Sequence, residues 1–333
     1  MWIYCVDRPP TVMRKAKTLL SVVIPTHNRP QFLREAVSSS LTSSPEHDTQ
    51  VIVVPNGNDE SWRAVALELQ GDSRISWHPL KTANANIARN FGMHLAVGKF
   101  VRFLDDDDFF YEAAAHQLVD LNDSNDDLSQ ANVDVVDDFA RTIRTLKPID
   151  HTDFAVRMLR PGRLALPTSF VFKRSFLENR RWATDMPFAQ DIAFALSLVR
   201  DAEAFTRTYD QTVGAWRQHN AQRISTTPSR DRHLRQWAKL LLDTTEGLSE
   251  RGAFSTERKS AAAAGLWECA HRGFPSSPMF WTNIARIATS HCHQSGPPDP
   301  AYNEIPLSWL PPIAGEWVLL PYRILRRATR KLI

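Results

Sequence analysis

The chain has 333 residues, of which 43% are hydrophobic and 23% charged, and its formal net charge is +3. This length is enough to bury one large core or two modest ones. The nearly balanced charge excludes a strongly basic surface, so no nucleic acid is expected as a partner. Three widely separated cysteines do not predict a disulfide framework and favour a reducing, cytoplasmic location. Residues 1–17 lack the apolar core of a signal peptide.

Strand and helix patterns alternate through the first third of the chain. Short apolar runs bounded by turn residues predict strands over 19–24, 51–54, 75–77 and 100–104. Apolar residues at helical spacing predict helices over 31–41, 62–69 and 84–97. This order predicts an α/β fold with a mostly parallel sheet flanked by helices. The polar loops after three of the strands, near Asn28, Asn56 and Asp105, should meet at one edge of the sheet.

Four consecutive carboxylates, Asp105 to Asp108, directly follow the apolar run 100–104. Ligands of open α/β sheets bind at the carboxyl ends of the strands, where these side chains are expected. Carboxylates held so close repel one another, and their hard oxygen atoms suit Mg²⁺ or Mn²⁺. The alternative is a solvated acidic turn that caps a helix beginning near Tyr111.

Four segments in this order and spacing resemble family 2 glycosyltransferases: Leu20–Arg29 (LSVVIPTHNR), the turn after Val54, Ala88–Gly92 (ARNFG) and Phe103–Asp108 (FLDDDD). The resemblance covers about residues 18–225. It implies a GT-A fold, which is a Rossmann-like nucleotide-binding domain with an acidic DXD motif. It also implies a hexosyltransferase-like enzyme that uses a nucleoside-diphosphate sugar as donor.

The resemblance assigns roles to individual positions. The residues that would bind the donor nucleotide are Pro25, Thr26, Asn28, Arg29, Asn56, Arg89, Asp105 and Asp106. Asp107 and His219 would hold Mn²⁺ or Mg²⁺, which bridges the donor's phosphates and neutralises charge on the departing nucleoside diphosphate. Arg217, Arg223 and Ser225 would belong to a loop that folds over the diphosphate, although a plain polar surface loop remains the alternative.

Asn56 departs from the family pattern, which usually has two Asp residues where this chain has Pro55-Asn56. An amide both donates and accepts hydrogen bonds, whereas an ionised carboxylate only accepts. Uracil is therefore not assured as the base, and thymidine and guanosine donors stay open. A simple tight turn at Asn56-Gly57 is equally compatible with the sequence.

Asp191 is the expected general base, because inverting transfer needs a carboxylate that takes the proton of the acceptor hydroxyl. The family usually has Glu-Asp here, and this chain has Gln190-Asp191 at the start of an amphipathic helix. The upstream segment Pro167–Arg174 resembles the strand that leads into the acceptor site. The alternative is that Asp191 only caps the helix.

The last third of the chain lies beyond the resemblance and has helical patterns over 233–248, 257–271 and 278–290. Residues 321–333 form a basic amphipathic segment with Arg323, Arg326, Arg327 and Arg330 on one side and Ile324, Leu325, Ala328 and Leu332 on another. Such a segment favours peripheral contact with the inner face of an anionic membrane. A terminal helix packed on its own domain, with a solvated basic face, is the alternative.

These observations predict an N-terminal extension over 1–17, a GT-A domain over 18–228 and a helical C-terminal region over 229–333. The GT-A domain divides into a nucleotide-sugar half, 18–110, and an acceptor half, 111–228. The expected reaction is inverting, metal-dependent sugar transfer to a hydroxyl of a glycan or lipid-linked acceptor, in polysaccharide or cell-surface glycan synthesis. An inactive sugar-nucleotide or glycan-binding module and a sugar nucleotidyltransferase are the alternatives; the loop 25–30 has no glycine, which disfavours the latter.

Overall fold

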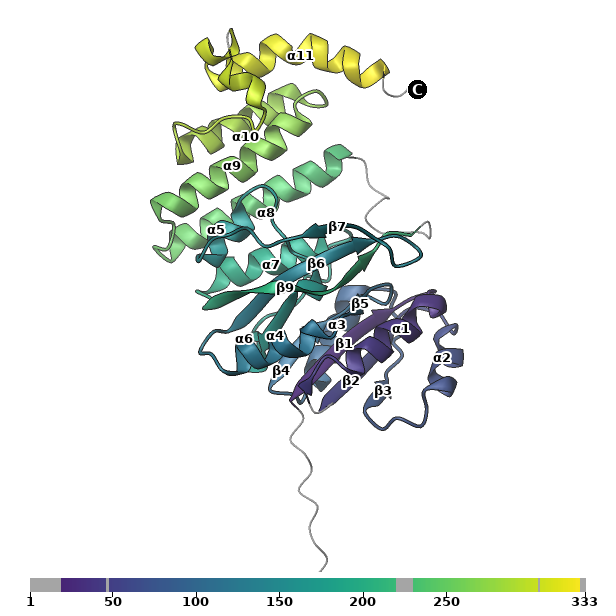
Figure 1. Cartoon of the computed structure of the whole chain (residues 1–333). Helices are drawn as coiled ribbons and strands as arrows, with labels where there is room; N and C mark the ends of the chain where they lie inside the picture. Colours follow the sequence, from purple (N-terminus) through teal and green to yellow (C-terminus); the bar gives the residue numbers. More distant parts are fainter. Residues whose placement is uncertain (1–18, 46–47, 220–229, 305, 330–333) are drawn as a thin grey trace, which may run out of the picture.

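A mixed β-sheet forms the centre of the structure (Figure 1). The computed structural model describes residues 19–45, 48–219, 230–304 and 306–329. Within these residues the sheet has nine strands in the order β3-β2-β1-β4-β8-β6-β9-β5, with β7 paired to β6. The sheet and its flanking helices confirm the predicted α/β fold.

The first four strands are parallel, as the alternation of strands and helices predicts. They are β1 (Leu20–Thr26), β2 (Thr49–Pro55), β3 (Ile75–Trp77) and β4 (Phe100–Phe103). Leu20 at the start of β1 is paired with Thr49 on one side and with Phe100 on the other. Because the strands run in the same direction, the loops after β1, β2 and β4 begin at the same edge of the sheet.

The second half of the sheet is mixed, and the sequence pattern predicted only one of its strands. These strands are β5 (Phe109–Phe110), β6 (Leu128–Val136), β7 (Thr142–Leu146), β8 (Phe170–Lys173) and β9 (Thr206–Arg217). β8 is antiparallel to β4 and so joins the two halves. β5 lies between the acidic residues and the next helix, which begins at Ala113. The acidic run is therefore a loop between two strands, and the alternative in which it caps a helix beginning near Tyr111 is wrong.

Helices cover both faces of the sheet because consecutive residues of its central strands are apolar, and successive side chains point to opposite faces. Val22 and Ile24 of β1 belong to one buried cluster and Val23 to the other. The cluster with Val22 includes α1 (Pro30–Leu41), α2 (Trp62–Glu68) and α4 (Ala113–Asn122). The cluster with Val23 includes α3 (Ala85–Leu95), α5 (Phe154–Leu159), the short α6 (Arg174–Leu177) and α7 (Gln190–Asp201). A 3₁₀ turn, η2 (Pro167–Ser169), precedes β8.

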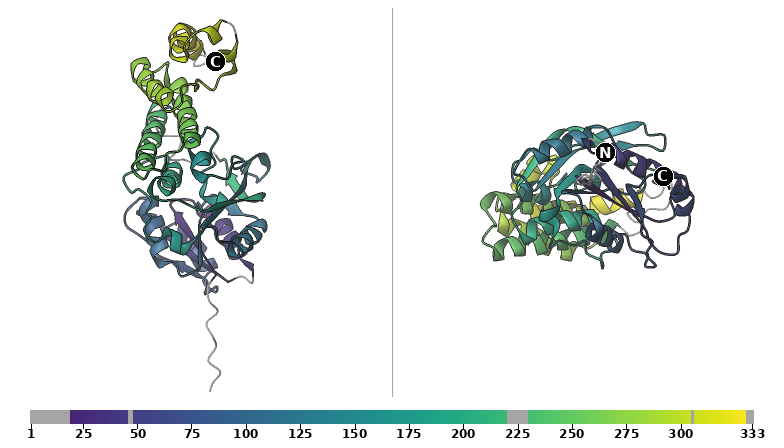
Figure 2. Two further views of the ribbon diagram at one scale, coloured as in Figure 1. Left: turned by 90° about the vertical axis from the view of Figure 1, so that its left-hand side faces the viewer. Right: turned by 90° about the horizontal axis from the view of Figure 1, so that it is seen from below.

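The C-terminal helices stack beyond the sheet at one end of the molecule (Figures 1 and 2). They are α8 (Arg230–Glu250), α9 (Thr256–Gly273), α10 (Pro278–His291) and α11 (Pro312–Thr329), with the 3₁₀ turns η4 (Pro300–Asn303) and η5 (Leu307–Trp309) before α11. Helices α8 to α10 share one buried cluster with Val23 of the sheet. The division at residues 228/229 stays a prediction. Within the residues described here, no helix combines the length and the apolarity that crossing a membrane requires.

Gly214 tests how tightly β9 packs against β5 and η2 beside the acidic loop. A Cβ at this position would lie 2.6 Å from the carbonyl oxygen of Phe109 and 2.8 Å from Cγ2 of Thr168. We expect Gly214→Ala to lower the free energy of unfolding by about 1–3 kcal/mol, because the backbone must move to admit the methyl group. Urea denaturation measures the change. Gly71→Ala is the control, since its Cβ would meet nothing within 4 Å; equal effects of the two changes would contradict the packing argument.

Candidate active site

Three loops are hydrogen-bonded to one another at the carboxyl edge of the parallel strands. The backbone N–H of His27 donates to Oδ2 of Asp106 at 3.1 Å, which joins the first loop to the acidic loop. The backbone N–H of Asn56 donates to the carbonyl oxygen of Thr26 at 3.0 Å, and its Nδ2 donates to the same oxygen at 2.9 Å. The expectation that these loops meet at one rim is therefore confirmed.

Each of the four carboxylates has a hydrogen-bond donor within the protein. Nη1 of Arg29 donates to Oδ1 of Asp106 at 3.0 Å and to Oδ2 of Asp107 at 2.9 Å. Oδ2 of Asp107 also lies 2.7 Å from Nε2 of His219. Asp108 accepts hydrogen bonds from the hydroxyl of Thr168 and from the backbone N–H of Arg217, each at 3.1 Å. The protein's own donors thus offset part of the repulsion between these side chains.

Burial nevertheless keeps two of these carboxyls difficult to ionise. Burial raises the pKa of Asp106 to about 7 against the opposing attraction of Arg29, and the charge of Asp107 raises it further. Burial also raises the pKa of Asp108 well above its ordinary value, with added repulsion from Asp107 and Asp105. A cation bound among these groups would favour their ionised forms.

Asp105, Asp107 and Asp108 form the best-placed set of ligands for such a cation. One carboxylate oxygen from each lies within 4.8 Å of the others. Three hard oxygen atoms gathered in this way fit a small divalent cation such as Mg²⁺ or Mn²⁺. The sequence analysis placed Asp107 and His219 in this role. The geometry adds Asp105 and Asp108, and the assignment of individual ligands stays a prediction.

Arg89 links the acidic loop to the start of α7. Its Nη2 donates to Oδ1 of Asp105 at 2.5 Å, and its Nη1 donates to Oε1 of Gln190 at 3.1 Å. The guanidinium lies 4.4 Å above the ring of Trp182, and the residue is only 4% exposed. Asp191 follows Gln190 directly. The same guanidinium therefore fixes the position of the metal-ligand candidates relative to the candidate base.

Three asparagines, at the N-cap of α3 and within it, hydrogen-bond residues 182–184. This segment contains Trp182, whose ring lies beneath the guanidinium of Arg89. The side chains of Asn84 and Asn86 donate to the carbonyl oxygens of Thr184 and Ala183, at 2.8 and 2.6 Å. The amide of Asn90 both donates to the carbonyl oxygen of Trp182 and accepts from its backbone N–H, each at 2.9 Å. These bonds position the indole beneath the guanidinium. The sequence analysis did not identify this function of the asparagines.

Asp191 lies in the first turn of α7 and is partly exposed. The helix begins at Gln190 after Ala189, and within the described chain no side chain caps it. The alternative that Asp191 serves as the helix cap is therefore wrong. Burial raises the pKa of Asp191 to about 7, and the charge of Asp105 adds to this effect while Arg89 opposes it. A carboxyl with such a pKa suits proton transfer near neutral pH.

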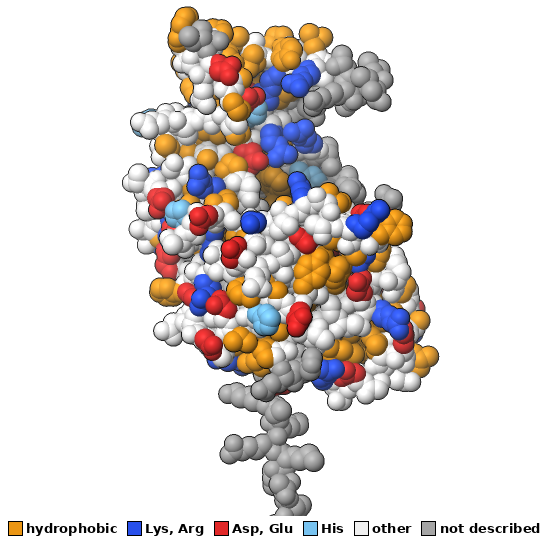
Figure 3. All heavy atoms as spheres, viewed as in Figure 1, with side chains coloured by type: hydrophobic (Ala, Val, Ile, Leu, Met, Phe, Trp, Pro, Cys, Tyr) orange, Lys and Arg blue, Asp and Glu red, His pale blue; other side chains and the backbone are white. Residues whose placement is uncertain are grey.

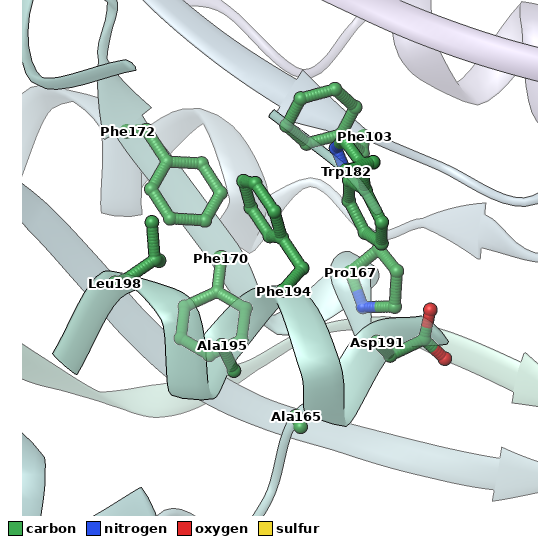
Figure 4. Close-up of a pocket in the computed structure, with 10 residues that line it drawn as sticks. All are labelled: Phe103, Ala165, Pro167, Phe170, Phe172, Trp182, Asp191, Phe194, Ala195 and Leu198. Atoms are coloured by element: carbon green, nitrogen blue, oxygen red, sulfur yellow. The ribbon is translucent and has the colours of Figure 1, made fainter. Parts of the chain in front are cut away.

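An apolar cavity adjoins the candidate base. It is lined by Phe103, Ala165, Pro167, Phe170, Phe172, Trp182, Asp191, Phe194, Ala195 and Leu198 (Figure 4). The rings of Trp182 and Phe194 are stacked with their centroids 4.1 Å apart. Figure 4 shows the Asp191 carboxylate at the edge of this group, pointing away from the aromatic rings. The aromatic side chains give the base an apolar wall on one side.

The remaining predicted donor residues lie on the same rim. Pro25 and Thr26 end β1, and Arg29 precedes α1. Asn28 has a left-handed backbone with φ of 55°, and its N–H donates to Oδ2 of Asp59 at 2.8 Å. Asn56 is 5% exposed and uses its amide to brace Thr26. Arg223 and Ser225 lie outside the described residues. The binding roles of all these residues stay predictions.

Sequence reasoning missed three residues of the site. Asp59 is buried and accepts hydrogen bonds from the N–H groups of Asn28 and Ser61. Its place at the end of the turn after β2 was the available signal, since Asp in turns commonly bonds nearby backbone. Phe32 lies in the predicted helix 31–41, and its ring lies 4.9 Å from that of His219, a contact that the helical pattern does not predict. Thr168 lies in the segment Pro167–Arg174 that the sequence analysis linked to the acceptor site, but its hydrogen bond to Asp108 was not predicted.

Arg217 fastens the acidic loop to two other elements. Its Nε donates to the carbonyl oxygen of Asp107 at 3.3 Å, and its Nη1 donates to that of Asp138 at 3.2 Å. Its Nη2 pairs with Glu35 of α1. The guanidinium also lies 5.0 Å from the ring of Phe109. This geometry favours a structural role beside the predicted contact with diphosphate.

The sequence profile of glycosyl transferase family 2 matches residues 21–189, which is about half of the chain. The matched region includes the four parallel strands and the acidic loop. The chain belongs to glycosyltransferase family 2.

Named relatives agree with this assignment. The chain is 24% identical over 232 residues to the uncharacterized glycosyltransferase EpsJ of Bacillus subtilis, which covers 66% of this chain and 67% of EpsJ. It is 32% identical over 95 residues to the uncharacterized glycosyltransferase RC0461 of Rickettsia conorii, over 28% of this chain and 16% of that protein. The chain also covers only 27% of the length of a Rickettsia felis relative.

The fold is also that of a solved structure. TarS of S. aureus, residues 1–349 in complex with UDP-GlcNAc, superposes with a TM-score of 0.63 over 82% of this chain and 81% of that chain. The two sequences are 14% identical. At this identity the likeness establishes the GT-A type of fold and not the substrate.

The variant Arg217→Lys tests whether the guanidinium of Arg217 fastens the acidic loop. We expect the free energy of unfolding to fall by about 1–3 kcal/mol, because an ammonium group cannot bond all three partners. Chemical denaturation measures this free energy of unfolding. Arg141→Lys, at a 74% exposed side chain paired with Asp137, is the control and should change stability by less than about 1 kcal/mol. A loss no larger than in the control would show that Arg217 does not fasten the loop.

Proposed function

We propose that the chain catalyses inverting transfer of a sugar from a nucleoside-diphosphate sugar to a hydroxyl group of an acceptor. The observation that carries this proposal is the bridge through Arg89, which joins Asp105 to Gln190, the neighbour of Asp191 in the chain. A glycosyl transfer needs a site for the departing diphosphate and a base for the acceptor close together. The closeness of Asp191 to Asp105, whose charge raises the pKa of Asp191, supports such an arrangement.

The donor half of the rim would bind the nucleotide and its diphosphate. The loops that contain Thr26 and Asn56 would enclose the nucleoside, and Asp105, Asp107 and Asp108 would hold a divalent cation. When bound, the cation neutralises negative charge on the departing diphosphate. Arg29 and Arg89 already face these carboxylates, so they keep the acidic loop ordered before donor and cation arrive.

Asp191 would act as the general base. Its carboxylate takes the proton of the acceptor hydroxyl while that oxygen bonds to the anomeric carbon. The bond from this carbon to the diphosphate oxygen breaks at the same time, and the nucleoside diphosphate leaves with the electron pair. A single displacement of this kind inverts the anomeric configuration. The replacement of the usual Glu by Gln190 leaves one carboxylate fewer beside the base.

UDP-sugars are the first donors to test, because the TarS fragment with the same fold was solved with UDP-GlcNAc. Asn56 keeps GDP- and dTDP-sugars open, since its buried amide bonds the backbone of Thr26 where the family usually has a carboxylate.

The acceptor would be a hydroxyl of a glycan or a lipid-linked sugar, in polysaccharide or cell-surface glycan synthesis. We retain the prediction that residues 321–333 contact a membrane peripherally, on the cytoplasmic side. A lipid-linked acceptor would be presented at that surface.

Asp191→Asn separates catalysis from donor binding. We expect the transfer rate to fall by about 10²–10⁴-fold, because the amide cannot accept the proton, while donor affinity stays unchanged. Radiolabelled sugar transfer and calorimetric titration with the donor measure the two quantities. Asp201→Asn, at the exposed end of the same helix, is the control. Unchanged transfer by Asp191→Asn would remove this residue from the mechanism.

The pH dependence of transfer reports the ionisation of the base. Only the ionised Asp191 can accept a proton, and burial raises its pKa to about 7 before any cation binds. We expect the rate to rise with pH and then level off, with a midpoint at or below this value, because a cation beside Asp105 favours the ionised form. A rate that falls as pH rises from about 5 to 7 would contradict the assignment.

Thermal stabilisation by UDP, GDP and dTDP, each with and without Mn²⁺, identifies the donor class. A ligand at about 100 times its Kd stabilises the folded state by about 2.7 kcal/mol, so one nucleotide should raise the melting temperature most. We expect this shift to require the cation and to disappear in Asp107→Asn. Asp72→Asn, outside the rim, is the control and should keep the shift. An equal shift without metal would contradict the proposed cation site.

A further inference from the structure

Large apolar side chains are concentrated on the surface of the C-terminal end. Of the fourteen large hydrophobic side chains that are exposed in the described chain, seven lie between residues 309 and 325. Five belong to α11: Trp317, Val318, Tyr322, Ile324 and Leu325. Trp309 is 74% exposed, and Leu310 lies beside it in the chain. Figure 3 shows hydrophobic side chains along the top of the molecule, over α11.

Helix α11 packs a charged side, rather than its apolar side, against the rest of the protein. Its only carboxylate, Glu316, is fully buried and lies 2.5 Å from Nδ1 of His271 on α9. Arg323, two turns later, pairs with Glu316 and also donates to the carbonyl oxygen of His271. The sequence analysis placed Arg323 on one basic side together with Arg326, whereas the structure turns Arg323 inward against α9. This packing agrees with the alternative of a terminal helix that lies on its own domain, although Arg323 is not on a solvated face. This ionic contact holds the charged side of α11 against α9.

The opposite side of α11 is consequently presented to the outside. Positions 317, 318, 321, 324 and 325 follow the spacing of a single helical face, and each is exposed. Exposed hydrophobic side chains on a soluble protein are usually scattered singly. Here five apolar side chains (Trp, Val, Pro, Ile and Leu) adjoin one another on a single helical face, which is typical of an interaction surface.

The chemistry at the edge of this face selects the partner. Tyr322 and the exposed Arg326 flank it, and the exposed side of the described helix has no carboxylate. Trp and Tyr prefer the boundary between lipid and water, and arginine is attracted to anionic headgroups. Since α11 cannot cross a bilayer, it would lie in the plane of the surface with the apolar face inward.

We propose that η5 and α11 form a rigid, preformed face that inserts into the surface of an anionic phospholipid bilayer. The face is defined by Trp309, Val318, Ile324 and Leu325. Trp317 lies at its inner edge, because its indole N–H donates to the hydroxyl of Thr282 and its ring packs against Phe274. The side chains of the face need no folding step on binding, because the contact of Glu316 with His271 and Arg323 already fixes the helix. Membrane binding itself is independent of the proposed sugar transfer; only the inference that it brings a lipid-linked acceptor near the rim rests on that function.

Vesicle flotation without any sugar nucleotide tests the proposal. The full chain should float with vesicles of phosphatidylcholine and phosphatidylglycerol, and much less with phosphatidylcholine alone. The double variant Val318→Glu/Leu325→Glu should lose binding at least tenfold and keep its melting temperature. Leu67→Glu on α2 is the matched control, since Leu67 and Leu325 are both 67% exposed; it should bind as the parent does.

The proposal is overturned if the parent chain does not float with anionic vesicles. It is also overturned if the double variant floats as well as the parent. If the parent chain fails to float but forms a dimer that the double variant abolishes, the face is an interface between two copies of this chain. Light scattering after size-exclusion chromatography detects that outcome. Since neither assay contains donor or acceptor, failure here leaves the proposed transfer untouched.

Discussion

The buried guanidinium of Arg89 is the contact on which the arrangement of the rim depends. It joins Asp105 of the acidic loop to Gln190 at the start of α7, two elements 85 positions apart in the chain. The ring of Trp182 supports it, and the asparagines of α3 hold that ring. A buried charge is costly unless it is paired and hydrogen-bonded, and both terminal nitrogens of Arg89 have such partners. The bridge therefore keeps the start of α7, which contains Asp191, next to the acidic loop.

In the acidic loop, the repulsion between neighbouring carboxylates is opposed by arginine side chains held next to them. Arg29 and Arg89 each pair with part of it, and Arg217 bonds its backbone. These contacts explain how four consecutive carboxylates stay ordered in a buried loop. They do not remove the repulsion, because burial still raises the pKa of Asp106 and Asp108. The repulsion that remains between the carboxylates favours the binding of a divalent cation among Asp105, Asp107 and Asp108.

The sequence predicted the parallel half of the fold well, because each of its strands is a short apolar run and the first three are each followed by an amphipathic helix. It did not predict β5, β6, β7 and β9. The pairing of β9 with β5 and β6 joins residues far apart in the chain, and β7, which forms a hairpin with β6, is almost entirely exposed. The candidate metal residues and Asp191 were found because they stand in local motifs. The partners of Asp108, the asparagines of α3 and the inward turn of Arg323 depend on tertiary contacts that no local pattern encodes.

The central claim is that Asp191 and the acidic loop carry out a single displacement at the anomeric carbon. Proton NMR of the sugar that is released when the chain slowly hydrolyses α-linked UDP-GlcNAc in the presence of Mn²⁺ tests it most directly. Spectra recorded before the sugar mutarotates should show the β-anomer first, and Asp191→Asn should release none above background. An α-anomer formed first would contradict the single displacement.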